Sequence, residues 1–295
     1  MEQNQQRAES FVFLNGSIVP AGAAAISVFD AGLLHGASTF TTMLAHNGVV
    51  FRLDRHLDRL LDTVALLGMR TTATRQSLGQ ACRAVLDANG LAEARMRITL
   101  TPGSVRPGLP HEQGGSPTIL VTADPLPPAP TEWYTRGITV VVSTFKQVAG
   151  DVTFGYKTGC YMPRILARQE AAAKGADEAL WFNTDNYLAE SCFNNVFLVS
   201  GGKVMTPPRD TPVLPGIVRG AVLELCGELG IPSDAETPLT IDDLLAAGEV
   251  FLTGSTSGIR PVVRVERHAV GQERPGAVTA RLMEAYGGLL ERECK

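Results

Sequence analysis

The first 125 residues alternate short apolar segments with two amphipathic stretches. Two pairs of apolar segments flank an Asn-Gly dipeptide, at Asn15-Gly16 and at Asn47-Gly48, which is the strongest short-range signal for a β-hairpin. Apolar residues then recur at helical spacing over residues 56–67 and over 78–86, and this predicts two helices. Strands are expected at six places: 11–14, 18–20, 39–45, 49–51, 95–101 and 118–123.

The pattern beyond residue 134 again mixes strands and helices. Strands are predicted where β-branched and aromatic residues cluster between turn signals: 138–143, 178–182, 187–190, 195–200, 203–206, 249–253 and 259–265. Residues 152–156 are also strand-like. Helices are predicted from spacing and end signals at 163–174, 217–229, 241–247 and 277–292.

A proline-rich segment separates these two halves. Residues 124–130 hold four prolines, which favour a stiff and extended chain. We therefore expect a mixed α/β (α+β) fold with a small N-terminal domain over 1–123, a linker over 124–133 and a larger domain over 134–295.

The composition of the chain excludes several classes of protein function. The chain has 295 residues, 44% of them hydrophobic and 19% charged, as in ordinary globular proteins. Its net charge is −4 and it has no run of Lys and Arg, so we expect no nucleic-acid partner. No apolar stretch approaches the ~20 residues that span a bilayer, and the polar N-terminus does not resemble a signal peptide. The five cysteines lack CxxC spacing, so we expect a cytoplasmic protein without disulfides or a metal site.

Two ionisable residues stand where chemistry is plausible. Lys157 precedes a predicted helix, and partial desolvation there would give a nucleophilic amine. The alternative is a solvated surface lysine. Glu190 ends a predicted strand among small and apolar residues, where a carboxylate needs a partner such as a protonated ring nitrogen. The alternative is a carboxylate that faces water or an arginine.

Other segments could bind an anion, but their sequence patterns are less specific for that role. The polar loop over 254–258 and the helix that begins after Leu214 could each present N–H groups to an anion, although both also suit a plain turn or helix start. Arg59 lies off the apolar stripe of its helix, on a face with His56 and Thr63, where a solvated face is the ordinary expectation. His56 is interpreted as a structural residue or one that supports another side chain.

Taken in order, these segments resemble the class IV aminotransferases, which are the fold-type IV pyridoxal-phosphate (PLP) enzymes. This family includes branched-chain and D-amino-acid aminotransferases, R-selective amine transaminases and 4-amino-4-deoxychorismate lyase. The resemblance runs from about Phe11 to Val265. It is carried by short segments: Asp30 to Gly36, Phe40 to Met43, His56 to Leu60, Lys157 with Arg168 to Ala171, Leu188 to Ser191 with Asn195 to Phe197, Leu214 to Ile217, and Leu252 to Ser255.

The resemblance implies a role for each matching residue. Lys157 resembles the catalytic Schiff-base lysine, which also moves the substrate's α-proton, and Glu190 resembles the carboxylate that pairs with the PLP ring nitrogen. Arg59 resembles the phosphate-binding arginine. The remaining cofactor contacts would come from Tyr161 at the phenolic oxygen, Leu214 on the ring face, and Ile217, Val218 and Ser255 at the phosphate.

The substrate pocket departs from the family pattern. The expected pocket residues are Phe40, Thr41, Arg106, Gly254 and Thr256. Thr41 stands where a glutamate is common, and the pair Thr41-Thr42 is similar to the lyase branch. Val218 replaces a frequent threonine, and Gly258 a common glutamate. Arg106, in a loop that resembles the substrate-gating loop, is either a carboxylate-binding arginine or a solvated one.

The leading hypothesis is a PLP-dependent aminotransferase that works by a ping-pong mechanism. Its partners would be an amino donor, either an amino acid or an amine, and a 2-keto acid acceptor. The resemblance further implies a homodimer with active sites at the subunit interface. The alternatives are a 4-amino-4-deoxychorismate lyase that releases pyruvate and a non-enzymatic protein that keeps the fold without the cofactor.

Overall fold

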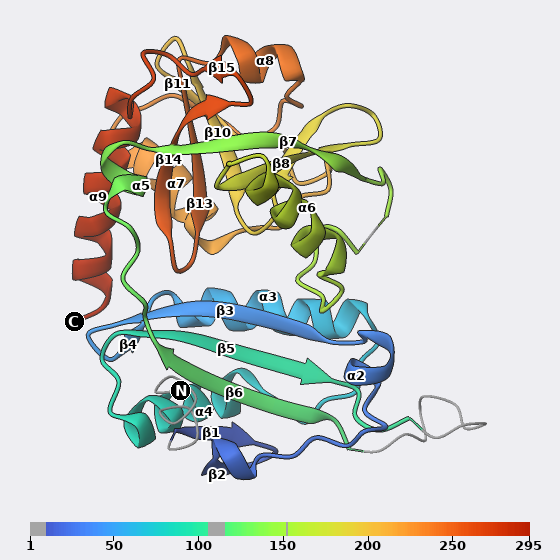
Figure 1. The fold of residues 1–295 in the computed structure, drawn as a ribbon. Coiled ribbons are helices and arrows are strands. Elements are labelled where there is room, and N and C mark those ends of the chain that lie inside the picture. Colours follow the sequence, from blue (N-terminus) through green and yellow to red (C-terminus); the bar gives the residue numbers. More distant parts are fainter. Residues whose placement is uncertain (1–9, 106–115, 152) are drawn as a thin grey trace. The chain divides into compact units, whose positions relative to one another are not determined.

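A computed structural model describes residues 10–105, 116–151 and 153–295, which form two compact units (Figure 1). Of the described residues, unit 1 contains those up to Pro127 together with Lys157–Cys160 and Arg292–Lys295, and unit 2 contains those from Pro128 to Tyr156 and from Tyr161 to Glu291. The division at Pro127 lies inside the segment expected as a linker, 124–133. That segment also holds the end of one strand and the start of a short helix. Two short segments, Lys157–Cys160 and Arg292–Lys295, group with unit 1.

Unit 1 is built on a six-stranded antiparallel sheet with the order β2-β1-β6-β5-β3-β4. Its strands are β1 (Phe11–Leu14), β2 (Ser17–Pro20), β3 (Thr39–His46), β4 (Val49–Val50), β5 (Ala94–Thr101) and β6 (Thr118–Pro125). Its helices are η1 (Ala21–Ala23), α2 (Ala31–His35), α3 (Leu53–Leu66) and α4 (Arg75–Asn89). Both predicted hairpins are present, and Asn15 and Gly16 take the positive φ angles that such tight turns need.

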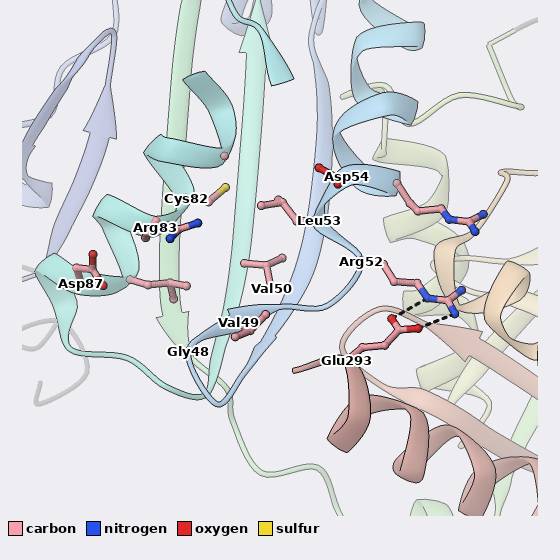
Figure 2. A pocket seen from close by; sticks show the side chains of 13 residues that line it. Gly48, Val49, Val50, Arg52, Leu53, Asp54, Cys82, Arg83, Asp87 and Glu293 are labelled. Atoms are coloured by element: carbon pink, nitrogen blue, oxygen red, sulfur yellow. Dashed lines mark hydrogen bonds and ion pairs between the residues drawn. The ribbon is translucent and has the colours of Figure 1, made fainter. Parts of the chain in front are cut away.

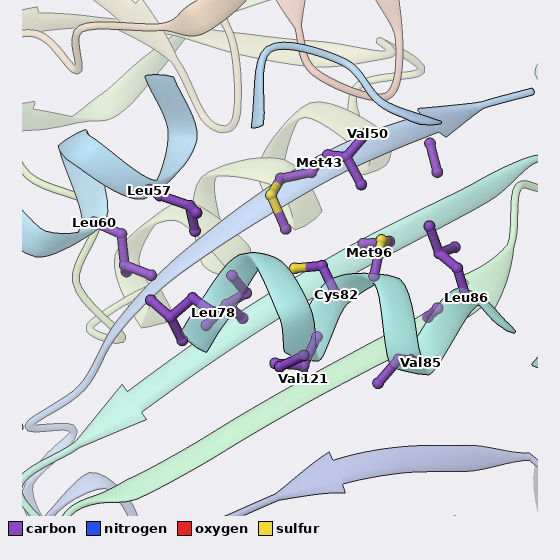
Figure 3. Packing of buried hydrophobic residues seen from close by; sticks show 14 of the residues in the cluster. Met43, Val50, Leu57, Leu60, Leu78, Cys82, Val85, Leu86, Met96 and Val121 are labelled. Atoms are coloured by element: carbon purple, nitrogen blue, oxygen red, sulfur yellow. The ribbon is translucent and has the colours of Figure 1, made fainter. Parts of the chain in front are cut away.

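The core of unit 1 lies between the sheet and helices α3 and α4 (Figure 3). The apolar stripe of α3 supplies Leu57 and Leu60, and α4 supplies Leu78 and Cys82, all of them nearly inaccessible to water. They meet alternate residues of the strands, such as Met96, which follows from the two-residue period of a β-strand. This packing fixes β3 and α3, which carry most of the site residues of unit 1.

Unit 2 is built on a nine-stranded mixed sheet. Its strands are β7 (Ile138–Gln147), β8 (Glu178–Asn183), β9 (Leu188–Ser191), β10 (Asn195–Ser200), β11 (Lys203–Met205), β12 (Ser233–Asp234), β13 (Glu249–Gly254), β14 (Gly258–Val265) and β15 (His268–Ala269). The main path runs β12-β11-β10-β13-β14-β7-β8-β9, and β9 pairs back onto β10. Six strands therefore close into a ring, and the closing pair is Asn195 with Glu190.

Five helices complete unit 2: α5 (Glu132–Thr135), α6 (Met162–Ala173), α7 (Ile217–Glu228), α8 (Ile241–Ala246) and α9 (Ala277–Glu293), the last of which ends in unit 1. Helix α8 begins at Thr240, whose side chain closes a capping box with Asp243. Among the described residues, no helix is long and apolar enough to cross a membrane.

The mixed α/β fold is confirmed, and so are the main predicted strands and helices, with ends that differ by a few residues. One expectation is wrong, because residues 153–156 form turns and not a strand. Asp151 is the physical reason, since its Oδ1 accepts hydrogen bonds from the backbone N–H and the hydroxyl of Thr153, at 2.8 and 2.7 Å.

Candidate active site

Lys157 is anchored to the start of strand β3 in unit 1. Its carbonyl oxygen accepts hydrogen bonds from Phe40 N and from Thr39 Oγ1, each at 3.0 Å. Two residues later Gly159 N donates to Ser38 O at 2.8 Å, and a Cβ at Gly159 would collide with the Ser38 side chain. These backbone hydrogen bonds fix the position of Lys157. The side chain of Lys157 extends toward Phe40, and its Nζ lies 4.8 Å from the centroid of the Phe40 ring.

Phe40 also contacts a second cation, Arg97, which the sequence did not single out. Arg97 lies on β5, opposite Thr42 of β3, and its Cζ is 3.6 Å from the centroid of the Phe40 ring. Its Nε donates to Thr99 Oγ1 at 3.0 Å. The strand alternates polar residues, among them Arg95 and Arg97, with apolar ones, so the sequence did not distinguish Arg97 from an ordinary solvent-facing arginine. The pairing register that places it over Phe40 was not readable from the sequence.

Thr41 links Arg59 to His56 through hydrogen bonds. Arg59 Nη2 donates to Thr41 Oγ1 at 3.1 Å, and Thr41 Oγ1 lies 2.8 Å from His56 Nδ1. The Thr41 hydroxyl therefore accepts a hydrogen bond from the guanidinium and shares a second one with the imidazole, so one side chain links the arginine to the histidine. His56 and Thr63 are buried and Arg59 is half-buried, so the expectation of a solvated helix face is wrong.

The charge state of His56 follows from the same surroundings. Burial lowers its pKa well below the usual 6.5, and the positive charges of Arg59 and Lys157 lower it further. His56 is therefore a neutral ring that holds Thr41 in place, in agreement with its interpretation as a supporting residue.

We predict that His56 makes folding pH-dependent below its ordinary pKa. The unfolded chain takes up a proton near pH 6.5 and the folded chain does so only at lower pH, so stability is full above pH 6.5 and falls as the pH drops. The slope approaches about 1.4 kcal/mol per pH unit. Urea unfolding of the wild type and of His56→Asn between pH 7.5 and 5 measures it, and parallel curves for the two proteins would contradict the prediction.

Glu190 lies at the point in unit 2 where β9 closes the sheet onto β10, and only 3% of it is exposed. Its Oε1 accepts hydrogen bonds from Arg164 Nη2 at 2.5 Å and from Gln147 Nε2 at 3.2 Å. Its Oε2 accepts from Leu214 N at 3.2 Å. Glu190 is thus buried and is bound to an arginine, which is one of the partners that the sequence analysis considered for it.

Asn195 joins several of the predicted cofactor residues of unit 2. In the sheet, Asn195 of β10 is paired directly with Glu190 of β9 and with Thr253 of β13. Its side-chain Nδ2 donates a hydrogen bond to Leu214 O at 2.9 Å. A Cβ at position 216 would collide with the side-chain oxygen of Asn195, so only glycine allows the chain to approach Asn195 this closely.

The helix that follows Gly216 presents N–H groups suited to an anion. Gly216 is the N-cap of α7 and provides no side-chain cap, so the first N–H groups, which include those of Ile217 and Val218, lack that partner. Within the described residues, the buried Thr253 Oγ1 has no hydrogen-bond partner. Gly254 ends β13, and Ser255 and Thr256 form the turn to β14. Helix N–H groups together with hydroxyls fit a phosphate, and a carboxylate such as Glu190 fits a protonated ring nitrogen, so unit 2 has groups that suit PLP.

Of two further residues predicted for the site, Tyr161 lies in the described part of the structure and Arg106 does not. Tyr161 lies at the N-cap of α6, where its ring stacks on Phe193 with centroids 5.8 Å apart. Arg106 lies outside the described residues.

A pocket of about 710 Å³ opens elsewhere in unit 1 (Figure 2). It lies among β4, the start of α3 and helix α4, and it shares no lining residue with the group around Lys157. Its Arg52 is held by Glu293 through two hydrogen bonds of 3.1 and 3.0 Å. The described residues contain no group of three or more potential metal ligands.

Comparisons with known proteins identify the family of the chain. The sequence profile of the family described as "Amino-transferase class IV" matches residues 38–265. The putative branched-chain-amino-acid aminotransferase of Methanocaldococcus jannaschii is 35% identical over 276 residues, which cover 93% of this chain and 94% of that protein. The solved branched-chain amino acid aminotransferase of Escherichia coli matches with a TM-score of 0.92 at 30% identity, over 97% of this chain and 96% of that one.

A T.th. branched-chain amino acid aminotransferase, solved with pyridoxamine 5'-phosphate, matches with a TM-score of 0.90 at 27% identity, over 97% of this chain and 94% of that one. The cofactor of the family is PLP. The chain thus belongs to the class IV aminotransferases, and it is a PLP-dependent enzyme that transfers an amino group between an amino acid or amine and a 2-keto acid.

Proposed function

We propose that the amino donors are branched-chain L-amino acids and that the enzyme works by a ping-pong cycle. The names of the relatives at 30–35% identity support this substrate class. The observation that carries it is the group formed by Lys157, Phe40 and Arg97. An apolar ring next to a guanidinium suits a substrate that has an apolar side chain and a carboxylate.

Each candidate residue then has a proposed role. Lys157 Nζ would hold PLP covalently and, after the amine of the donor has displaced it, would move the α-proton of the substrate as a free amine. Arg59 binds the phosphate, and Thr41 and His56 fix the direction of its guanidinium. When bound, PLP supplies an electron sink for the bonds at the substrate α-carbon. The other cofactor contacts are assigned to Tyr161, Glu190, Leu214, Ile217, Val218 and Ser255.

The remaining proposals concern substrate contacts, domains and assembly. Phe40, Thr41, Arg106, Gly254 and Thr256 are proposed to line the substrate pocket. Unit 1 contains the proposed small domain, and unit 2 most of the cofactor-binding domain. A homodimer is supported by an exposed apolar group on α2 and the segment before it: Ile26, Val28, Phe29, Leu33 and Leu34. All five cysteines are free thiols, which supports a reducing, cytoplasmic location.

The two halves of the cycle test the proposed function separately. We expect L-leucine, L-isoleucine or L-valine alone to convert the bound cofactor stoichiometrically to its pyridoxamine form, followed by absorbance, and a 2-keto acid to restore it. D-amino acids and simple amines serve as comparison donors. A donor preference for D-amino acids or amines would contradict the substrate class. Pyruvate release from 4-amino-4-deoxychorismate without any such half-reaction would favour the lyase.

A further inference from the structure

Arg164 lies in an electrostatically unfavourable place that its partners explain. It belongs to the first turn of α6, where the helix dipole disfavours a positive charge, and its side chain is only 12% exposed. Its Nη1 donates to Ser191 O and Cys192 O, both at 3.0 Å, and its Nη2 donates to Glu190 Oε1. The guanidinium therefore binds the end of strand β9 at three points, one of them the Glu190 carboxylate.

Aromatic rings hold this guanidinium. Its Cζ lies 5.6 Å from the ring centroid of Tyr161 and 5.6 Å from that of Trp181. Burial is the largest single influence and lowers the pKa of Arg164, but the charge and hydrogen bond of Glu190, together with Tyr161 and Cys192, outweigh it, and the net shift is upward. A planar, permanently charged fork suits this arrangement better than a lysine ammonium does.

The hydrogen bonds of Glu190 distinguish its two oxygens. A carboxylate oxygen has about two acceptor positions. Oε1 already accepts from Arg164 and from Gln147, so its capacity is filled. Oε2 accepts from one donor among the described residues, the backbone N–H of Leu214, which leaves one position open.

We propose that Arg164 is a positioning residue for the cofactor ring: by binding Oε1 it fixes the direction of the Glu190 carboxylate and leaves Oε2 as the atom that accepts the ring N–H. This inference rests on the proposed role of Glu190. Without the guanidinium, the buried carboxylate loses its opposing charge and its fixed direction. It then turns away, and the ring nitrogen loses its anionic partner.

The test uses PLP that carries ¹⁵N in its ring, bound to the wild type, Arg164→Met and Arg164→Lys. We expect the ring-nitrogen NMR signal of Arg164→Met to shift toward that of unprotonated PLP. The rate of the amino-donor half-reaction should fall by about 10- to 100-fold, by analogy with the loss of a residue that orients a metal-binding side chain. Arg164→Lys should keep most of the ring-nitrogen signal and recover part of the rate.

Two further variants separate the possible failures. Arg168→Met removes an arginine from the same helix whose contact is Glu178, at 4.0 Å, and it should leave the ring signal unchanged. Glu190→Gln tests the underlying assignment, because an unchanged ring signal there would show that Glu190 does not face the ring nitrogen. If Glu190→Gln moves the signal while Arg164→Met keeps the wild-type signal and rate, the positioning role of Arg164 is wrong. If Arg164→Met does not fold, Arg164→Lys decides, since a wild-type rate with the fork removed would overturn the proposal.

Discussion

Replacing Lys157 with alanine is expected to lower transaminase turnover by at least about 10⁴-fold, the upper range for loss of one general acid–base group. The covalent link to PLP is lost as well. The fold should persist, because Lys157 holds β3 through its carbonyl oxygen, which alanine retains. The structural loss is the contact of Nζ with the Phe40 ring, worth about 0.5–1 kcal/mol. Steady-state rates and thermal unfolding measure both effects.

The position of the covalent link is a separate readout. After borohydride reduction of the wild type, mass spectrometry should find the pyridoxyl adduct on Lys157. Lys174→Ala is the matched control, because this exposed lysine forms its ion pair with Glu170, a surface residue of helix α6, and its loss should change neither the adduct nor the rate. An adduct on Lys146, Lys174 or Lys203 would refute the assignment.

Local sequence signals were sufficient to predict most of the helices and strands. The Asn15-Gly16 hairpin and the stripe of α3 each depend on residues within a few positions of one another, so turn chemistry and periodicity predict them. Helix α2 was missed because five residues are too few to show a helical period, although Asp30 caps it through Gly32 N. The strand expected over 152–156 is absent at residues 153–156, because the side chain of Asp151 accepts hydrogen bonds from Thr153 and favours a turn.

Contacts between distant segments could not be predicted. The closure of the unit 2 sheet depends on the pairing of Asn195 with Glu190, and the grouping of Lys157 with β3 joins residues 118 positions apart. The sequence placed Glu190 at a strand end and left open whether it faces an arginine. Its partner, Arg164, lies 26 residues away on a helix whose pattern gives no hint of the contact.

Glu190→Ala is expected to destabilise unit 2 by about 3–5 kcal/mol, in addition to its effect on the reaction. The change removes the partner of a buried guanidinium, and a buried charge without its partner is strongly unfavourable. It also leaves Gln147 Nε2 and Leu214 N without their acceptor. Urea unfolding of the apoenzyme measures the loss apart from any contribution of PLP binding.

Two comparisons show whether the buried pair causes the loss. Asp58→Ala breaks an ion pair with Arg75 in which both side chains are about half exposed, and it should cost at most about 1 kcal/mol. The double variant Glu190→Ala with Arg164→Met removes both charges, so it should be more stable than Glu190→Ala alone. If the double variant is instead less stable by the sum of the two single losses, Arg164 and Glu190 do not act on each other. The stability of strand β9 would then come from packing and not from this ion pair.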